Sequence, residues 1–356
     1  MIQVSTRTLK EMVSKAIKGC SNNKMLPMTS IMAVQLKEGE LTLITTDMTN
    51  YLYVSDEVAG EDFYATVKAD MFARLILSIT SETISFEMAE KFLEIHGNGV
   101  YKVDLVLDET GSMVEFPEFN PVGTSIGEVS MATVRSVLDT LKPALSKDVV
   151  TPCYTNYFVG DSVIATDLNV INSMDTKLFN TDSPLFISSE LMDLIGLCTG
   201  DTVDVRNEGD LLDIVSDHVQ IHSTLYDYVS QYQTEDINAV IAYDYPSKCE
   251  VNRNALLQTL DRIALFLDDE FADGVVNMIF GGDGLTIEST LSNGTETLAY
   301  VTSDHTDDFT CMVDVQSLRE QIKSFAVENL TIYYGREESI KLVDGDVLSC
   351  IGLVSE

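Results

Sequence analysis

The sequence has no run of apolar residues close to the roughly 20 that a membrane-spanning helix requires. Residues 1–12 (MIQVSTRTLKEM) also lack the hydrophobic segment of a signal peptide. A hydrophobic fraction of 45% without low-complexity segments is typical of an ordered globular protein. We therefore expect a chain that folds in the cytoplasm.

Cysteine is sparse and scattered. The six cysteines form neither a CxxC pair nor a Cys/His cluster, so their spacing gives no zinc-site signature. In a cytosolic chain, isolated cysteines in apolar surroundings are expected to be buried thiols and not disulfides. They are Cys20, Cys153, Cys198, Cys249, Cys311 and Cys350.

Catalytic motifs are missing as well. The chain contains no G-x-S-x-G or H-E-x-x-H segment, and no Walker lysine follows the glycines of residues 281–284. His218 and His222 have the spacing of a metal pair on a helix, but residues 215–225 alternate as a strand does, and no third ligand is near. We predict a non-catalytic protein without a metal ion or cofactor.

The sequence does contain one pattern that occurs three times. Residues 251–267 form an amphipathic helix pattern in which Asn252 is the expected capping residue. Residues 4–17 and 129–145 begin in the same way, with a valine, a polar residue and an apolar stripe. Valines 4, 129 and 251 are separated by 125 and 122 residues, which is the size of a domain.

Each third continues with the same order of elements. A strand pair joined by a glycine-containing turn comes next, then a short strand, a second helix and further strand pairs. This order predicts an α+β fold with three tandem copies of a domain that has two helices and about eight antiparallel strands. Expected loops at residues 117–124 and 243–247 place the domains at residues 1–123, 124–245 and 246–356.

Cationic residues are scarce. The sequence has 22 Lys and Arg and 57 Asp and Glu, which gives a net charge of −35. A uniformly acidic surface would repel the phosphates of a nucleic acid. The six predicted helices, however, contain 13 of the 22 cations and only 7 of the 57 carboxylates. Glu is as good a helix former as Lys, so helix propensity does not explain this pattern. It predicts a helical surface that meets a polyanion. The helices are residues 5–18, 68–79, 130–147, 188–198, 252–267 and 315–326.

Several short segments occur in an order that matches a known family. They are Lys24-Met25-Leu26-Pro27, residues 41–47 (LTLITTD), residues 163–167 (VIATD) and residues 116–119 (FPEF). From Met1 to Glu356 the chain resembles the bacterial DNA polymerase III β subunit, the DNA sliding clamp. The high acidity suggests a divergent member, with a virus of bacteria as one candidate source.

The resemblance implies a ring that encircles double-stranded DNA without reading its sequence. Two chains, each of three clamp domains, would form a head-to-tail homodimer, and the ring would tether the replicative polymerase and the clamp loader. A weakly positive lining would hold the DNA loosely enough to slide. The DNA-facing residues implied are Lys10, Lys15, Lys18, Lys24, Arg74, Arg135, Lys142, Lys147, Arg253, Arg262, Arg319 and Lys323.

The resemblance also implies a hydrophobic pocket that binds short linear motifs of these partners. Where the family usually has Thr-Asp-Gly-His-Arg-Leu, residues 166–171 read TDLNVI, and the C-terminal residues differ too, so a different peptide preference is expected. Ordinary core residues at a domain junction are an equally weighted alternative. The implied pocket residues are Tyr154, Thr166, Leu168, Asn169, Val170, Ile171, Val240, Ile351 and Leu353.

The implied dimer interface joins the first domain of one chain to the third domain of the other. Its apolar residues are Leu75, Val103 and Leu105 on one side and Leu265 and Phe266 on the other. Residues 100–107 would be an edge strand that pairs across the subunits. The alternative function is an acidic, non-catalytic interaction protein, or a DNA mimic, with the same fold.

Overall fold

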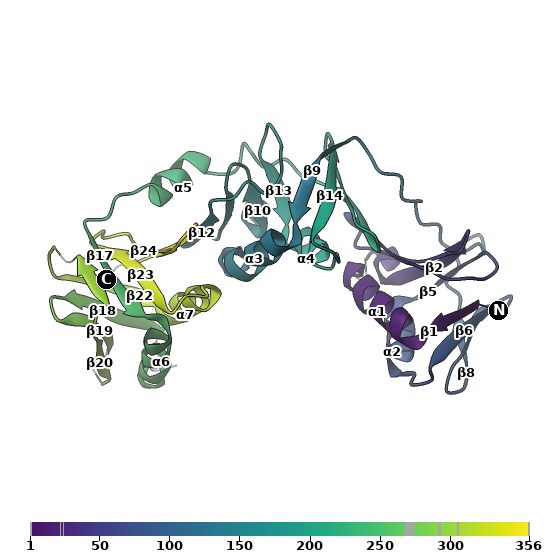
Figure 1. Cartoon of the computed structure of the whole chain (residues 1–356), viewed down its shortest axis with the longest axis horizontal. Coiled ribbons are helices and arrows are strands. Elements are labelled where there is room, and N and C mark those ends of the chain that lie inside the picture. Colours follow the sequence, from purple (N-terminus) through teal and green to yellow (C-terminus); the bar gives the residue numbers. More distant parts are fainter. Residues whose placement is uncertain are drawn as a thin grey trace. The chain divides into compact units, whose positions relative to one another are not determined.

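The computed structural model describes residues 2–21, 23, 25–267, 274–290, 293–304 and 306–354. The chain forms two compact units: Met1–Val134 with Glu190–Tyr226, and Arg135–Ser189 with Asp227–Glu356. The strands pair in an antiparallel manner in both units, and helices occur between the strand groups (Figure 1). The predicted α+β fold class is therefore confirmed.

The first unit contains two sheets. One has eight strands in the order β5-β2-β3-β4-β16-β15-β14-β9, and the other has the order β1-β6-β7-β8. The strands are β1 (Ile2–Ser5), β2 (Ile31–Lys37), β3 (Glu40–Thr46), β4 (Asn50–Glu57), β5 (Phe63–Lys68), β6 (Thr83–Met88), β7 (Phe92–His96), β8 (Val100–Asp104), β9 (Thr124–Ser130), β14 (Thr202–Glu208), β15 (Leu211–Val215) and β16 (Val219–Thr224).

Helices α1 (Thr6–Ala16) and α2 (Ala69–Ser78) pack side by side in this unit (Figure 1). The Ser5 hydroxyl caps α1 by accepting the Thr8 amide at 3.5 Å. Leu9, Met12 and Val13 are buried at helical spacing, so the apolar stripe seen in the sequence faces the core. Helix α4 (Ser189–Ile195) precedes β14 in the chain.

The second unit has a nine-stranded sheet in the order β13-β10-β11-β12-β25-β24-β23-β17-β21 and a second sheet in the order β20-β19-β18-β22. The strands are β10 (Asn156–Val159), β11 (Val163–Thr166), β12 (Val170–Met174), β13 (Leu185–Ser188), β17 (Ser247–Asn252), β18 (Val275–Gly281), β19 (Gly284–Ser289), β20 (Thr295–Leu298), β21 (Thr302–Asp304), β22 (Phe309–Asp314), β23 (Asn329–Tyr334), β24 (Ser339–Asp344) and β25 (Val347–Gly352).

Helices α6 (Arg253–Ile263) and α7 (Val315–Ser324) pack together in this unit. The Asn252 side chain accepts the Ala255 amide at 2.9 Å, so the predicted cap of α6 is confirmed. Helix α3 (Met131–Leu141) and the 3-10 helix η3 (Lys142–Ala144) precede β10. The six predicted helices are all found, and the 3-10 helix η4 (Pro152–Thr155) lies directly before β10.

Helix α5 (Thr234–Ile241) was not predicted. It has eight residues, of which Ile237 is buried, and its first turn carries Glu235 and Asp236 without any cation. It was missed because it does not belong to the repeated order of elements from which the other helices were predicted. In the part of the chain that the structure describes, no helix combines the length and apolar character needed to cross a membrane.

The sheets cross the limits of the sequence repeat. In the first unit, β4 pairs with β16, with Val54 opposite Val219. In the second unit, β12 pairs with β25, with Ile171 opposite Cys350. Each joint therefore connects one third of the sequence to the next through a continuous hydrogen-bonded sheet, while the three domain limits stay a prediction.

The expectation of buried thiols is confirmed for five cysteines, and Cys20 is half-buried. Burial raises the pKa of Cys249 and Cys311 to about 12, and that of Cys198 and Cys350 to about 11. These thiols are therefore almost fully protonated at neutral pH.

Candidate functional sites

The predicted DNA-facing cations differ in what they contact within their own unit. Six of them make no ion pair with a described carboxylate. Five of these lie on an α-helix or a 3-10 helix, and Lys147 follows η3 (Lys142–Ala144) by three residues. Lys10 and Lys15 are half-buried, whereas the other four are exposed. The six are Lys10, Lys15, Lys18, Arg135, Lys147 and Lys323.

Four of the remaining cations, all arginines, contact protein groups. Arg74 pairs with Asp70 one turn earlier on α2, and Arg319 of α7 pairs with Asp261 of α6. The Arg253 guanidinium donates to the Ile322 carbonyl at 2.9 Å and the Lys323 carbonyl at 3.1 Å, which satisfies the C-terminal end of α7. Lys142 lies in η3, and Lys24 lies outside the described residues.

Arg262 forms the best-defined of these pairs. Its Nε and Nη2 atoms donate to the two carboxylate oxygens of Glu296 on β20, both at 2.6 Å. This two-point contact lowers the pKa of Glu296 to about 2, with the Arg262 hydrogen bond as the main cause. Arg262 thus joins α6 to an edge strand, and less of its charge is available to a ligand.

A cavity of about 580 Å³ lies within the second unit. Its walls come from the segment after η3, the turn between β11 and β12, and the first turns of α7. Four of the predicted pocket residues line it, namely Tyr154, Leu168, Asn169 and Val170. We call this cavity the α7 pocket.

The turn at the mouth of the α7 pocket is built by its own side chains. The Thr166 hydroxyl accepts the Leu168 amide at 2.9 Å and donates to the Val170 carbonyl at 2.7 Å. Asp167 accepts the amides of Asn169 and Val170 at 2.9 and 2.7 Å. Leu168 adopts a φ of 75°, a region that favours glycine, and its side chain is 51% exposed.

Carboxylates dominate the polar lining of the α7 pocket. Asp148, Asp167, Asp314 and Glu320 contribute negative charge, against the single cation Lys147. Asp314 caps α7 by accepting the Ser317 amide at 2.6 Å. A pocket with this lining favours a ligand that presents apolar groups together with positive charge.

The other predicted pocket residues do not line this cavity. Thr166 and Ile351 are almost fully buried, and Ile171 belongs to a core cluster with Tyr232 and Ile237. Val240 on α5 packs against the same cluster, and Leu353 is half-buried after β25.

The lining from α7 was missed in the sequence. Asn172 of β12 donates to Gln321 of α7 at 2.6 Å, although the two residues are 149 positions apart. A sequence repeat shows that each third has a second helix, but not which of these helices lies beside the turn at residues 166–170. In the sequence, Asp314 is the residue that could have located the N-terminus of α7, because aspartate is a common helix cap.

The predicted interface residues lie in both units. Leu265 and Phe266, after α6, are 81% and 48% exposed. Leu75 and Leu105 are half-buried, and Val103 is 1% exposed, so Val103 packs inside its own unit. Strand β8 pairs with β7 alone among the named strands, so the described part of this sheet ends at β8. The edge strand expected at residues 100–107 is shorter, because β8 ends at Asp104 and Leu105 forms a bridge to Val67.

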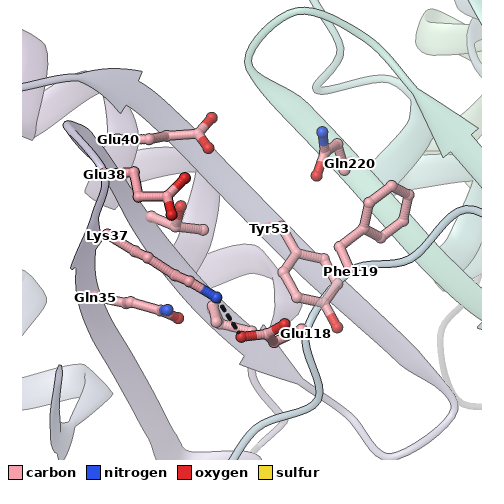
Figure 2. Close-up of a pocket in the computed structure, with 10 residues that line it drawn as sticks. Gln35, Lys37, Glu38, Glu40, Tyr53, Glu118, Phe119 and Gln220 are labelled. Carbon is pink, nitrogen blue, oxygen red and sulfur yellow. Dashed lines mark hydrogen bonds and ion pairs between the residues drawn. The ribbon is translucent and has the colours of Figure 1, made fainter.

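The first unit contains a smaller cavity of about 340 Å³, beside the segment that connects β8 to β9 (Figure 2). The Lys37 ammonium group points to Glu118 of this segment and lies 2.6 Å from its carboxylate (Figure 2). Phe119 packs against Tyr53, whose hydroxyl donates to the Pro117 carbonyl at 3.0 Å. These contacts fix the connecting segment on the eight-stranded sheet.

Comparisons with known proteins were made for the whole chain. No protein-family model matches it, and no curated protein matches it by sequence. Solved structures do match over the full length. The DNA polymerase sliding clamp from Bacillus subtilis has a TM-score of 0.86 at 14% identity, with 100% of this chain and 99% of that chain covered.

Two further structures agree. The DNA polymerase III β subunit from Thermotoga maritima has a TM-score of 0.86 at 15% identity, covering 100% of this chain and 99% of that chain. The sliding clamp from Pseudomonas aeruginosa has a TM-score of 0.82 at 15% identity, with both chains covered to 100%. These matches give no support to a viral source. Over its whole length, this chain has the fold of the bacterial DNA polymerase III β sliding clamps.

Proposed function

We propose that the protein is a DNA sliding clamp, a non-catalytic processivity factor that encircles duplex DNA. The observation that carries the proposal is the match to three-domain clamps along the entire chain, with a TM-score of 0.86. The proposal includes the three domains at residues 1–123, 124–245 and 246–356, and a cytoplasmic site of action. A ring of this kind acts by topology, because a polymerase attached to it cannot diffuse away from its template.

The order of strands supports a head-to-tail homodimer. The outer strand β4 of one third pairs with β16 of the next, and β12 pairs with β25 in the same way. In the last third, β20 occupies the position that β4 and β12 have in the other two thirds. In the first third, β8 occupies the position that β16 and β25 have in the others. Both end their sheets. Pairing of β20 with β8 of a second copy would repeat the same joint and cover both of these edges.

The helices support a DNA-facing role. Lys10 and Lys15 on α1, Arg135 on α3 and Lys323 on α7 make no ion pair with a described carboxylate. Cations that are not neutralised by the protein can exchange counterions with DNA phosphates. We therefore infer that these residues contribute more to DNA binding than the ion-paired Arg74, Arg262 and Arg319.

We propose that the α7 pocket receives the short linear motifs of the polymerase and the clamp loader. Leu168 and Tyr154 supply apolar surface, and the surrounding carboxylates favour a motif that carries Lys or Arg. Removing the C-terminal residues is a poor test of this role, because β25 lies between β12 and β24 in the nine-stranded sheet. A Leu168→Asp variant changes an exposed side chain instead, and should reduce primer extension by the replicative polymerase of the source organism.

The decisive experiment concerns DNA topology. Subunits are separated by dilution, concentrated again with a nicked circular DNA, and passed through a sizing column at moderate salt. A clamp should stay with the circle and leave after a restriction enzyme linearises it. Equal loss from circular and linear DNA would contradict encirclement.

A charge-reversed variant tests the lining. Lys10→Glu, Lys15→Glu and Arg135→Glu together should abolish retention on the circle, whereas Arg7→Glu should have a smaller effect, because Arg7 is already paired with Glu11 at 3.0 Å. Retention of the triple variant at the level of the unmodified chain would argue against these residues as the lining.

The second candidate function is an acidic interaction protein or DNA mimic with the same fold. It is favoured by the net charge of −35 and by the carboxylates that neutralise Arg74, Arg262 and Arg319. This function predicts a chain that never binds DNA but competes with DNA for a cationic protein. Retention on circular DNA would exclude it.

A further inference from the structure

The exposed face of the sheet β1-β6-β7-β8 carries two carboxylates and an imidazole close together. Glu87 of β6 lies directly opposite Glu94 of β7. His96 is two residues after Glu94 and therefore on the same face of the strand. Like charges directly opposite each other destabilise an antiparallel pair, so this position favours a cation between the two carboxylates.

The three side chains converge on one point. The His96 Nε2 atom lies 3.0 Å from the Glu94 carboxylate and 4.0 Å from that of Glu87. One ligand atom from each residue lies within 4.8 Å of the other two. Nε2 is shielded from solvent and has no hydrogen-bond partner of acceptable geometry, although the side chain as a whole is 30% exposed.

We propose that Glu87, Glu94 and His96 form a binding site for a divalent transition-metal ion, with Zn²⁺ as the best-suited ion. Zinc binds imidazole nitrogen and carboxylate oxygen at about 2.0–2.2 Å, which places neighbouring ligand atoms of a tetrahedron roughly 3.4 Å apart. The distances of 3.0 and 4.0 Å lie on either side of this spacing. Glu87, whose side chain is 57% exposed, has room to close the longer one.

The ligand set decides between classes of ion. Mg²⁺ and Ca²⁺ prefer six or more oxygen ligands, whereas an imidazole favours zinc and its neighbours in the first transition row. Three protein ligands leave a coordination position for solvent.

Lys102 is the competing cation. Its ammonium group lies 3.7 Å from Glu94 and 4.5 Å from the centre of the Phe92 ring. If a metal ion binds Glu94, the Lys102 ammonium group loses its contact with that carboxylate but keeps its favourable position over the Phe92 ring. Lys102 belongs to β8, so metal binding would change the charge arrangement beside the end of this sheet.

The test is a titration of the full chain with Zn²⁺ by calorimetry, and with Co²⁺ by visible absorption. We expect one saturable site with a micromolar Kd. Glu87→Gln and His96→Gln should each raise the Kd at least about tenfold. His218→Gln is the matched control, since it removes a histidine outside this site, and its Kd should not change.

Two results would overturn the proposal. One is the absence of saturable binding in the unmodified chain at millimolar Zn²⁺. The other is an equal Kd in the Glu87→Gln variant, the His96→Gln variant and the control. Far-UV circular dichroism and urea unfolding verify that each variant is folded, and line broadening of the His96 ring signals by Co²⁺ locates the ion independently of the variants.

Discussion

At the scale of single residues, Asp213 is a buried carboxylate whose loss should destabilise the fold. It is fully buried in the first unit, accepts the Val122 amide at 2.7 Å and contacts Nδ1 of His222 at 2.7 Å. Removing Asp213 leaves the Val122 amide and the half-buried His222 ring without this acceptor. Asp213→Ala should lower the free energy of unfolding by about 1–3 kcal/mol, measured by urea denaturation.

Asp210→Ala is the matched control for this prediction. Asp210 is an exposed residue of the turn between β14 and β15, so its replacement should change the stability by less than about 0.5 kcal/mol. If both variants unfolded at the same urea concentration, Asp213 would not have the stabilising role that its contacts indicate.

The thiols give a second prediction at this scale. Because burial raises the pKa values of Cys198 and Cys350 to about 11, and those of Cys249 and Cys311 to about 12, the native protein should contain very little thiolate at pH 8. Ellman's reagent should react with the native chain far more slowly than with the chain unfolded in urea. Burial also raises the pKa of Cys20 to about 12, so Cys20 has no larger thiolate fraction than the others. Because it is half-buried while the other five are buried, it should be the first to react, and Cys20→Ser should remove this first reaction.

At the scale of helices and strands, Arg262 and Glu296 give a prediction with a definite sign. The pKa of Glu296 is about 2 in the folded chain and lower than its usual value in an unfolded chain. The pair therefore stabilises the fold above about pH 4.3, and this contribution is lost as the pH falls towards 2. Because Glu296 is 34% exposed, the contribution is modest.

The measurement is the carboxyl ¹³C shift of Glu296 against pH. Arg262→Met should return the pKa towards the usual value for glutamate, whereas Arg7→Met, which breaks an exposed pair on α1, should leave it unchanged. A pKa that stays near 2 in the Arg262→Met variant would assign the shift to another group.

Most of the helices could be predicted from the sequence, but the contacts between distant segments could not. Helices α1, α2, α3, α6 and α7 were found because each has an apolar stripe. The seven-residue α4 was found because it occupies the place of the second helix in the sequence repeat, whereas α5 has no counterpart in the repeat. The α7 pocket was predicted only in part, since Asn172 and Gln321 meet across 149 residues of sequence. Glu94 and His96 lie two residues apart on one strand, which the sequence shows, but only the strand pairing places Glu87 opposite Glu94.

For the whole molecule, the prediction concerns mass. We expect light scattering to give twice 39.3 kDa. Leu265, with 81% exposure, is an apolar residue that a second copy should cover, so Leu265→Asp should shift the protein towards a monomer without unfolding it.

Val149→Asp is the control for the mass measurement. Val149 is 82% exposed on the second unit and lies outside the predicted interface, so this variant should keep the mass of a dimer. A monomeric mass for the unmodified chain at low and moderate salt would contradict a ring that is closed in solution.

The pairing of β4 with β16 limits how the chain can be divided. A fragment that ended at residue 123 would leave β4 without its neighbour, and an uncovered strand edge invites aggregation. A fragment that began at residue 246 would leave β25 without β12. A protease that cuts the segment before β9 should therefore produce two pieces that stay associated until a denaturant separates them. The sequence repeats three times, but its thirds are not separable modules.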